Sequence, residues 1–293
     1  MDRRAFLAGT AALALAPSLP AWKQRKDAPF RFGFVTDTHL GTPASFRWTD
    51  RALGTLRKRH ADVRLLIHGG DLLDRADALP SAESSPHVAQ WRGIVARHGF
   101  EARHALGNHD LAALAMPDDP GHGKTFFTRE IGLLNSHLQF GPLDFLFVDS
   151  LQLEAGSWEA RLEPLVMKWL GERLQAIPKD HPIILVSHVP LLTIMSQYEG
   201  GTAVAPSKRL QVQNAKEVYD LLRERRIVAA LQGHTHVQEI CDDGATRWTT
   251  GGAVCGDWWK GARFGRYEPN YAVCSWDGER LATTFETYGW KPG

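Results

Sequence analysis

Side chains that bind divalent cations recur in five short polar clusters along this chain. Histidine, aspartate and asparagine supply imidazole nitrogens together with carboxylate and amide oxygens, a mixture that suits zinc, iron or manganese. No cysteine lies in the clusters, so we expect no soft thiolate ligand. The clusters are Asp-x-His at 37–39, Gly-Gly-Asp at 69–71, Gly-Asn-His-Asp at 107–110, Ser-His at 187–188 and Gly-His-x-His at 233–236.

The first two clusters show why these positions suit a metal site. Asp37 and His39 are two residues apart at the end of an expected strand, so their side chains point to the same side and could bind one ion together. A polar turn after a strand would give the same short pattern. Asp71 follows two glycines that allow a sharp backbone turn, and its two carboxylate oxygens could bridge two cations.

Apolar segments of strand length alternate with segments whose apolar residues recur every three or four positions, as in helices. The expected strands are 30–36, 63–68, 143–148, 182–187 and 227–231, and the clearest expected helices are 47–59, 162–176 and 208–226. Strands that alternate with helices indicate βαβ units, so the predicted fold class is α/β. Near the C-terminus, 270–276 and 280–287 are expected to form a hairpin at a sheet edge.

The polar clusters come at the ends of strand-like segments. In open α/β sheets, the ligand crevice lies outside the carboxyl ends of the strands. We therefore expect the five clusters to converge at one edge of the fold.

The ordered series of clusters resembles the calcineurin-like metallophosphoesterase superfamily. The resemblance spans Asp37 to His236, and five pieces in the right order are far more specific than any one of them. It implies an αββα sandwich, in which two mixed β-sheets are flanked by helices. It also implies one metallophosphoesterase domain, which we place at 30–293 with the C-terminal hairpin included.

The same resemblance implies a binuclear centre of iron, manganese or zinc ions that share Asp71. The two expected ligand sets are Asp37, His39, Asp71 and His236 for one ion, and Asp71, Asn108, His188 and His234 for the other. The histidines outside the five clusters are expected to be structural or exposed, with His68 and His122 as the strongest exceptions.

The expected reaction is hydrolysis of a phosphate ester by a hydroxide that bridges the two ions. The sequence contains neither a Gly-x-Ser-x-Gly nucleophile motif nor a P-loop. His109 is the candidate proton donor to the leaving group. The resemblance implies that Asp74 lies against His109 and orients it, although a salt bridge to Arg75 or a helix cap is also consistent with Asp74.

The substrate stays open between phosphomonoesters and phosphodiesters. Asp74 stands where purple acid phosphatases carry a tyrosine ligand, and the ligand arrangement looks more like that of bacterial cyclic-nucleotide phosphodiesterases. Two loops, 192–207 and 251–269, are expected to select the substrate. In the second loop, the pair Trp258-Trp259 could stack on a base or sugar or could pack in the core, and Lys260 or Arg263 could contact a phosphate.

The N-terminal residues 1–22 have the layout of an export signal, with a cationic start, an apolar stretch and small residues. Residues 3–7, Arg-Arg-Ala-Phe-Leu, resemble a twin-arginine signal. We therefore expect a periplasmic or secreted protein that meets the export machinery for folded proteins and has no membrane anchor. An ordinary secretory signal or a cytosolic amphipathic leader would be the alternatives.

The composition of the 293 residues is that of a globular protein, and the net charge of +1 offers no general attraction for nucleic acid. We expect a small phosphate ester as the substrate and no stable nucleic-acid partner. A non-catalytic scaffold on the same fold and a nuclease of the same superfamily are the alternatives. The three cysteines fit either one disulfide with a free thiol or three buried thiols.

Overall fold

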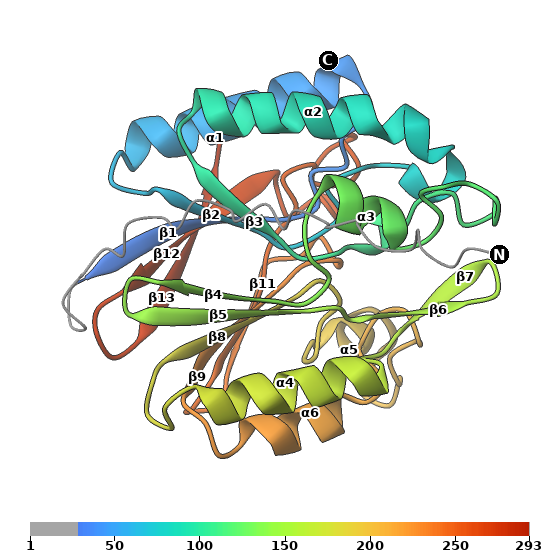
Figure 1. Cartoon of the computed structure of the whole chain (residues 1–293). Coiled ribbons are helices and arrows are strands. Elements are labelled where there is room, and N and C mark those ends of the chain that lie inside the picture. Colours follow the sequence, from blue (N-terminus) through green and yellow to red (C-terminus); the bar gives the residue numbers. More distant parts are fainter. Residues whose placement is uncertain (1–28, 293) are drawn as a thin grey trace, which may run out of the picture.

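The computed structural model describes residues 29–292, and the expected export signal at 1–22 lies outside them. Two β-sheets lie face to face between two helical layers (Figure 1). The α/β sandwich predicted from the sequence is therefore confirmed. Within residues 29–292, no helix is both long enough and apolar enough to cross a membrane.

The first sheet has five strands in the order β13-β12-β1-β2-β3. The strands β1, β2 and β3 are parallel, whereas β12 is antiparallel to both β1 and β13. Their bounds are β1 Phe30–Val35, β2 Leu65–His68, β3 Glu101–His104, β12 Asn270–Trp276 and β13 Leu281–Thr287. The C-terminal hairpin at a sheet edge is confirmed.

The second sheet has six strands in the order β10-β11-β9-β8-β5-β4. Its four central strands are parallel, and the two edge strands are antiparallel to their neighbours. The bounds are β4 Ser136–Phe140, β5 Leu143–Val148, β8 Ile183–Ser187, β9 Ile227–Gln232, β10 Glu239–Asp242 and β11 Arg247–Thr250. A separate hairpin is formed by β6 (Leu151–Glu154) and β7 (Ser157–Ala160).

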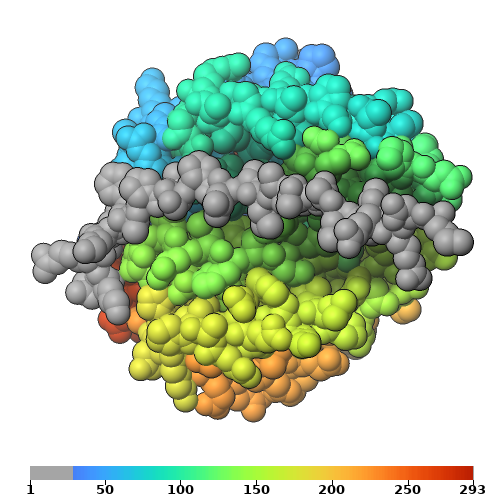
Figure 2. Space-filling view, viewed as in Figure 1, coloured from blue at the N-terminus to red at the C-terminus, as the bar shows by residue number. Residues whose placement is uncertain are grey.

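Helices cover the outer face of each sheet, and the two helical layers form opposite sides of the molecule (Figures 1 and 2). The helices α1 (Pro43–Arg59) and α2 (Ser81–Arg97) lie on the first sheet, and α4 (Pro164–Ala176) and α6 (Ala215–Leu222) lie on the second. Two short helices, α3 (Thr125–Glu130) and α5 (Met195–Gly200), lie in connecting segments.

Strands buried on both faces divide the core into three apolar layers. In β5, Phe145 and Phe147 face the other sheet, where the Phe145 ring meets Phe32 edge-on at 5.2 Å. Leu146 and Val148 point the other way, toward the layer under α4 and α6. Burial on both faces explains why residues 145–148 of this strand are apolar without alternation.

The predicted helix at 208–226 is too long, because α6 begins only at Ala215. Residues 208–213 instead run along β7, where the Ala160 N–H donates to the Lys208 carbonyl and the Gln213 N–H donates to the Ala160 carbonyl. The Asn214 side chain fixes this path by bonding both the N–H and the carbonyl of Leu162.

Candidate metal centre

Backbone pairing continues past the ends of β1 and β2 and brings the first two polar clusters together. The Asp37 N–H donates to the Gly70 carbonyl at 3.0 Å, and the His39 N–H donates to the Asp71 carbonyl at 3.2 Å. The carboxylate of Asp37 also accepts from the His234 N–H, at 3.0 Å to Oδ2. The strand ends of both sheets therefore meet at one place.

Five of the expected ligands have positive φ angles, which residues other than glycine rarely adopt. The φ angle is 53° at Asp37, 40° at His39, 53° at Asp71, 75° at His234 and 60° at His236. The left-handed region disfavours residues with a Cβ, and such strain clusters at functional sites. The fold holds these side chains in place at a local cost in energy.

The first group of side chains gathers around His39 and His236, whose Nε2 atoms are 3.2 Å apart. Asp37 Oδ1 lies 3.3 Å from the His236 Nε2, and Asp71 Oδ2 lies 3.6 Å from the His39 Nε2. All four side chains are buried. They are the four residues expected to bind one ion.

The second group gathers around His188. Its Nε2 lies 3.3 Å from Asp71 Oδ2 and 3.2 Å from Asn108 Oδ1. Ligand atoms of Asp71, His188 and His234 all lie within 4.8 Å of one another. Asp71 thus faces both groups, as expected for a bridging carboxylate.

Backbone carbonyls set which nitrogen of two histidines faces the carboxylates. His188 Nδ1 donates to the Gly69 carbonyl at 2.8 Å, and His236 Nδ1 donates to the Gly256 carbonyl at 2.6 Å. In the neutral imidazole, the lone pair is then on Nε2 and points into the cluster. This second layer of hydrogen bonds is typical of metal-binding histidines.

Two glycines allow the close packing around Asp71. A Cβ on Gly107 would lie 2.0 Å from the Asp71 backbone nitrogen and 2.2 Å from Asp71 Oδ1. A Cβ on Gly70, where φ is +98°, would lie 2.5 Å from His188 Nδ1. Neither position can accept a side chain without displacing the cluster.

The charges of the cluster shift one another's pKa values. Burial raises the pKa of Asp71, but the neighbouring His188 and His109 outweigh burial and hold it well below its usual range. Burial lowers the pKa of His188, but the Asp71 carboxylate outweighs it and raises the pKa to about 9. Burial and the charge on His188 lower the pKa of His234 to about 4. The buried carboxylate of Asp71 is therefore anionic near neutral pH and is stabilised by positive charge nearby.

His109 lies beside the cluster but is oriented differently from the expectation. Its N–H donates to Asp71 Oδ1 at 2.8 Å, and its Nδ1 donates to the backbone carbonyl of Asp74 at 2.6 Å. The Asp74 carboxylate faces His39 instead, with 3.5 Å between Oδ1 and Nδ1. The predicted contact between the Asp74 carboxylate and His109 is therefore wrong.

The cause is the path of the chain at Asp74. Its N–H donates to the Leu40 carbonyl at 3.1 Å, so this segment runs beside residues 39–41. The Asp74 side chain then crosses Gly41, where an added Cβ would lie 3.2 Å from the Asp74 Cβ, and it points toward His39. Asp74 contacts His109 through its main chain alone.

Two further residues support the turns that carry Asp71 and His109. The carboxylate oxygens of Asp110 accept from the N–H groups of Leu73 and Gly107, each at 3.0 Å. His68 Nδ1 accepts from the Gly70 N–H at 3.2 Å, one layer behind the cluster. His122 bonds the Ala113 carbonyl and does not line the cavity.

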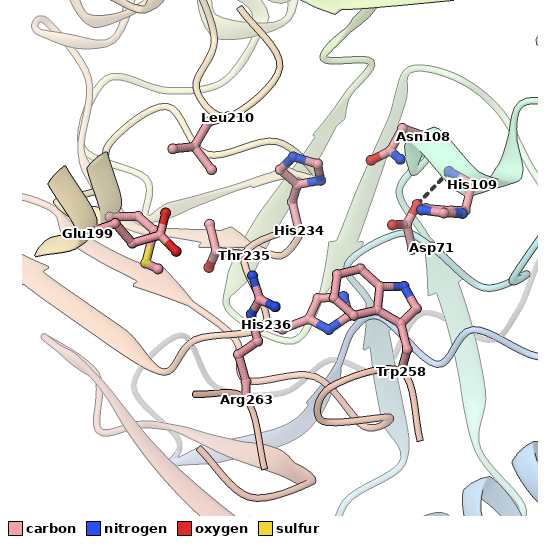
Figure 3. A pocket seen from close by; sticks show the side chains of 11 residues that line it. Asp71, Asn108, His109, Glu199, Leu210, His234, Thr235, His236, Trp258 and Arg263 are labelled. Carbon is pink, nitrogen blue, oxygen red and sulfur yellow. Dashed lines mark hydrogen bonds between the residues drawn. The ribbon is translucent and has the colours of Figure 1, made fainter. Parts of the chain in front are cut away.

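A cavity of about 210 Å³ opens over the two groups. Figure 3 shows Asp71, Asn108 and His109 on one side of it and Glu199 and Leu210 on the opposite side. Both loops expected to select the substrate contribute to it, through Met195, Glu199, Trp258 and Arg263. Leu210, just outside the first loop, was not predicted.

The two tryptophans of the second loop have different environments. Trp258 lines the cavity with its ring centroid 4.3 Å from that of His236, whereas Trp259 packs on the core and donates its Nε1–H to the His39 carbonyl at 3.1 Å. Trp259 therefore packs in the core, whereas Trp258 lines the cavity. Lys260 does not line the cavity.

Comparison with known proteins decides which family this cluster represents. The family described as "Calcineurin-like phosphoesterase" matches residues 30–238, which contain all five polar clusters. The chain belongs to the calcineurin-like phosphoesterase family. Membership supports a metal-dependent phosphoester hydrolase as the general class of activity.

Individual relatives of this calcineurin-like phosphoesterase are distant. Protein Tra of Streptomyces lividans is 24% identical over 209 residues, which cover 63% of this chain but only 32% of that protein. The purple acid phosphatase PPD1 of yellow lupin superimposes with a TM-score of 0.57 at 14% identity, over 89% of this chain and 52% of that one. This chain thus spans about a third of the length of protein Tra and about half of the length of the lupin phosphatase. The phosphopantetheinyl hydrolase of Mycobacterium tuberculosis gives a TM-score of 0.52 at 15% identity, over 89% and 98%.

The residues of this calcineurin-like phosphoesterase fit the dinuclear metal centre that the family binds. Buried Asp37 and Asp71 carry negative charge that a cation would neutralise. The Nε2 atoms of His39 and His236 are 3.2 Å apart, and two neutral lone pairs at that distance repel unless a proton or a cation lies between them. The donor set of nitrogen and oxygen suits iron, manganese or zinc.

Cys255 lies closer to the centre than the sequence indicated. Its buried Sγ is 3.7 Å from His236 Nδ1, and ligand atoms of His39, His236 and Cys255 fall within 4.8 Å. The thiol faces the Nδ1 side of His236, behind the nitrogen directed at Asp37. Spacing could not reveal this contact, because Cys255 follows His236 by 19 residues and is outside the five clusters. All three cysteines, each within the described residues, are free thiols.

Proposed function

We propose that this chain is a two-metal phosphoesterase in which Asp71 bridges the ions and His109 donates a proton to the leaving group. The observation that carries the proposal is the sharing of Asp71 between two ligand groups, directly beneath a cavity that His109 also lines. Asp37, His39 and His236 complete one ligand set. The other set is completed by Asn108, His188 and His234.

When bound, two divalent ions lower the pKa of a water molecule and stabilise negative charge on the phosphoryl oxygens, which is the chemistry of two-metal hydrolysis. The backbone carbonyls of Gly69 and Gly256 orient the imidazoles of His188 and His236 so that Nε2 faces the cluster. Asp110 holds the turns beneath them.

His109 is suited to protonate the leaving oxygen. Its Nδ1–H is committed to the Asp74 carbonyl, which leaves Nε2 as the atom free to exchange a proton with a substrate. In the metal-free protein burial lowers the pKa of His109, but the Asp71 carboxylate, the Asp74 carbonyl and the carboxylates of Asp77 and Asp74 together outweigh burial and raise the pKa above its usual value. A general acid must carry the proton that it donates, and Nε2 is the position for that proton in this orientation of His109. Asp74 acts in this proposal through its main chain.

The substrate that we propose is a small phosphomonoester or phosphodiester, and cyclic nucleotides belong among the candidates because of the ligand pattern. The test is a panel of phosphomonoesters, cyclic nucleotides, phospholipid head groups and sugar phosphates, assayed with the manganese, iron and zinc forms. Turnover of at least one class is expected. A metal-loaded protein that hydrolyses none of them would instead favour a scaffold role.

We also propose that residues 1–22 direct export through the machinery for folded proteins to the periplasm, because Arg3 and Arg4 precede an apolar stretch. Replacement of both arginines by lysine in the full chain is expected to retain the protein in the cytoplasm. Unchanged export, measured by cell fractionation, would indicate an ordinary secretory signal.

A further inference from the structure

Arg263 extends from the 251–269 loop to the wall of the metal cavity, and in the view of Figure 3 its guanidinium lies between Glu199 and Trp258. The side chain is 26% exposed. Its Nη1 donates to Asp257 Oδ1 at 2.9 Å. The cation is therefore mostly enclosed but reaches the space above the two ligand groups.

The guanidinium has donors that the protein does not use. Arginine offers five N–H groups in a rigid planar fork. Arg263 Nε is buried and has no hydrogen-bond partner among the side chains and backbone of residues 29–292. Nη1 is paired with Asp257, and no hydrogen bond within residues 29–292 uses Nη2, so Nη2 is the donor left for an acceptor in the cavity. The acceptor that best fits a planar fork of donors is a phosphate or carboxylate group.

The loop holds this guanidinium in a fixed position. Its carbon lies 4.3 Å from the Phe264 ring centroid and 5.2 Å from that of Trp258. Both aromatic residues have positive φ angles, 53° at Phe264 and 49° at Trp258. The N–H and carbonyl of Arg263 also pair with Tyr267, each bond at 2.9 Å. Backbone strain and hydrogen bonds within the loop hold the guanidinium in one position, as is typical of a preorganised binding site.

Trp258 sets the separation between Arg263 and the metal centre. The indole packs against His236, an expected ligand, and also against the Arg263 guanidinium. The indole of Trp258 therefore separates the guanidinium from the imidazole of His236, so Arg263 does not orient that ligand. A phosphoryl group at the metal centre would leave Arg263 to contact a neighbouring part of the substrate.

We propose that Arg263 binds a second anionic group of the substrate, so that the site prefers phosphate esters carrying another phosphate or a carboxylate near the scissile phosphate. This inference rests on the proposed function of the same site.

The test compares three non-hydrolysable anions on the metal-loaded protein by calorimetry. Methylphosphonate carries one anionic group, whereas methylenediphosphonate and phosphonoacetate add a second phosphonate and a carboxylate. The wild type is expected to bind at least one of the two larger anions more tightly than methylphosphonate. In Arg263→Gln this preference is expected to fall about tenfold, the usual effect of a lost charge-assisted hydrogen bond.

Arg266→Gln is the matched control, because Arg266 belongs to the same loop, lies over Tyr267 and does not line the cavity. It is expected to keep the preference, and Arg263→Lys is expected to keep part of it through the retained charge. An unchanged preference in Arg263→Gln, or an equal loss of affinity for all three anions, would overturn the inference. Binding is measured without turnover, so an inactive wild type would refute the proposed function and leave this comparison intact.

Discussion

Asp71 is the residue on which both ligand groups depend. Its Oδ2 lies 3.6 Å from His39 Nε2 and 3.3 Å from His188 Nε2, while its Oδ1 accepts from the His109 N–H at 2.8 Å. The positive φ angle aims the carboxylate into the cluster. Removal of its charge should therefore affect both ions at once.

We predict that Asp71→Asn loses metal from both positions and abolishes phosphoester hydrolysis, because an amide supplies neither the bridging oxygens nor the negative charge. Elemental analysis and a turnover assay measure the two effects. Asp62→Asn removes a carboxylate from an exposed ion pair with Arg31 and is expected to change neither. Full activity of Asp71→Asn would refute the site.

We predict that His109→Ala retains its metal and loses about a hundredfold or more in rate on alkyl phosphate esters, since a general acid contributes that much. The loss should be smaller on p-nitrophenyl esters, whose leaving group needs no proton. Steady-state rates on the two ester types provide the comparison. Equal losses on both types would contradict the role of His109 as proton donor.

Metal binding should be pH-dependent, because the ion must displace the proton from His188. In the metal-free protein the pKa of His188 is raised to about 9, so its stabilising ion pair with Asp71 is fully present below about pH 6.5 and is lost as pH rises through 9. Metal affinity is expected to increase over the same range. Calorimetric titration in buffers of different ionisation enthalpy should show proton release at pH 7, and a pH-independent affinity would contradict this prediction.

At the scale of elements, the turns after β2 and β3 determine the geometry of the site. They are fixed to each other by Asp110, and they approach so closely that Gly107 has no room for a Cβ beside Asp71. The obstructing atoms include backbone, which cannot rotate away as the end of a side chain could.

We predict that Gly107→Ala lowers the free energy of unfolding by about 1–3 kcal/mol, as expected for overpacking in a closely packed region. The control is Gly171→Ala, which lies in α4 with open space at its Cβ position and should raise the free energy of unfolding by up to about 1 kcal/mol. Urea denaturation of the metal-free variants measures both changes. A neutral Gly107→Ala would show that the two turns separate easily.

The sequence predicted the elements that carry strong periodic patterns and missed those that depend on tertiary contacts. The strand at 143–148 was placed correctly, because residues 145–148 are apolar on both faces. The helix α2 was not recognised, since it contains Pro86 and its apolar pattern is weak. The beginning of α6 is set by Asn214, whose partner Leu162 is 52 residues away in the chain.

The polar clusters could be assigned to one edge of the fold because they follow strands. Contacts made by side chains in irregular loops could not be predicted. The Asp74 carboxylate faces His39, and Cys255 lies behind His236. Both depend on the direction of a side chain within an irregular loop, which periodicity does not encode.

At the scale of the whole molecule, each ligand group draws on both sheets. Asp37, Asp71 and Asn108 follow strands of the first sheet, whereas His188 and His234 follow strands of the second. A pair of bound ions would therefore fasten the two halves of the sandwich to each other, in addition to the apolar layer between them.

This arrangement makes metal occupancy a measure of completed folding. A chain in which only the first sheet has formed possesses three of the four ligands of one ion and two of the four ligands of the other, and the second sheet alone supplies one and two. A partially folded molecule would therefore retain ions poorly. The centre would discriminate mature molecules from immature ones, and the fraction of a preparation that carries two ions would count the molecules in which the two sheets have docked.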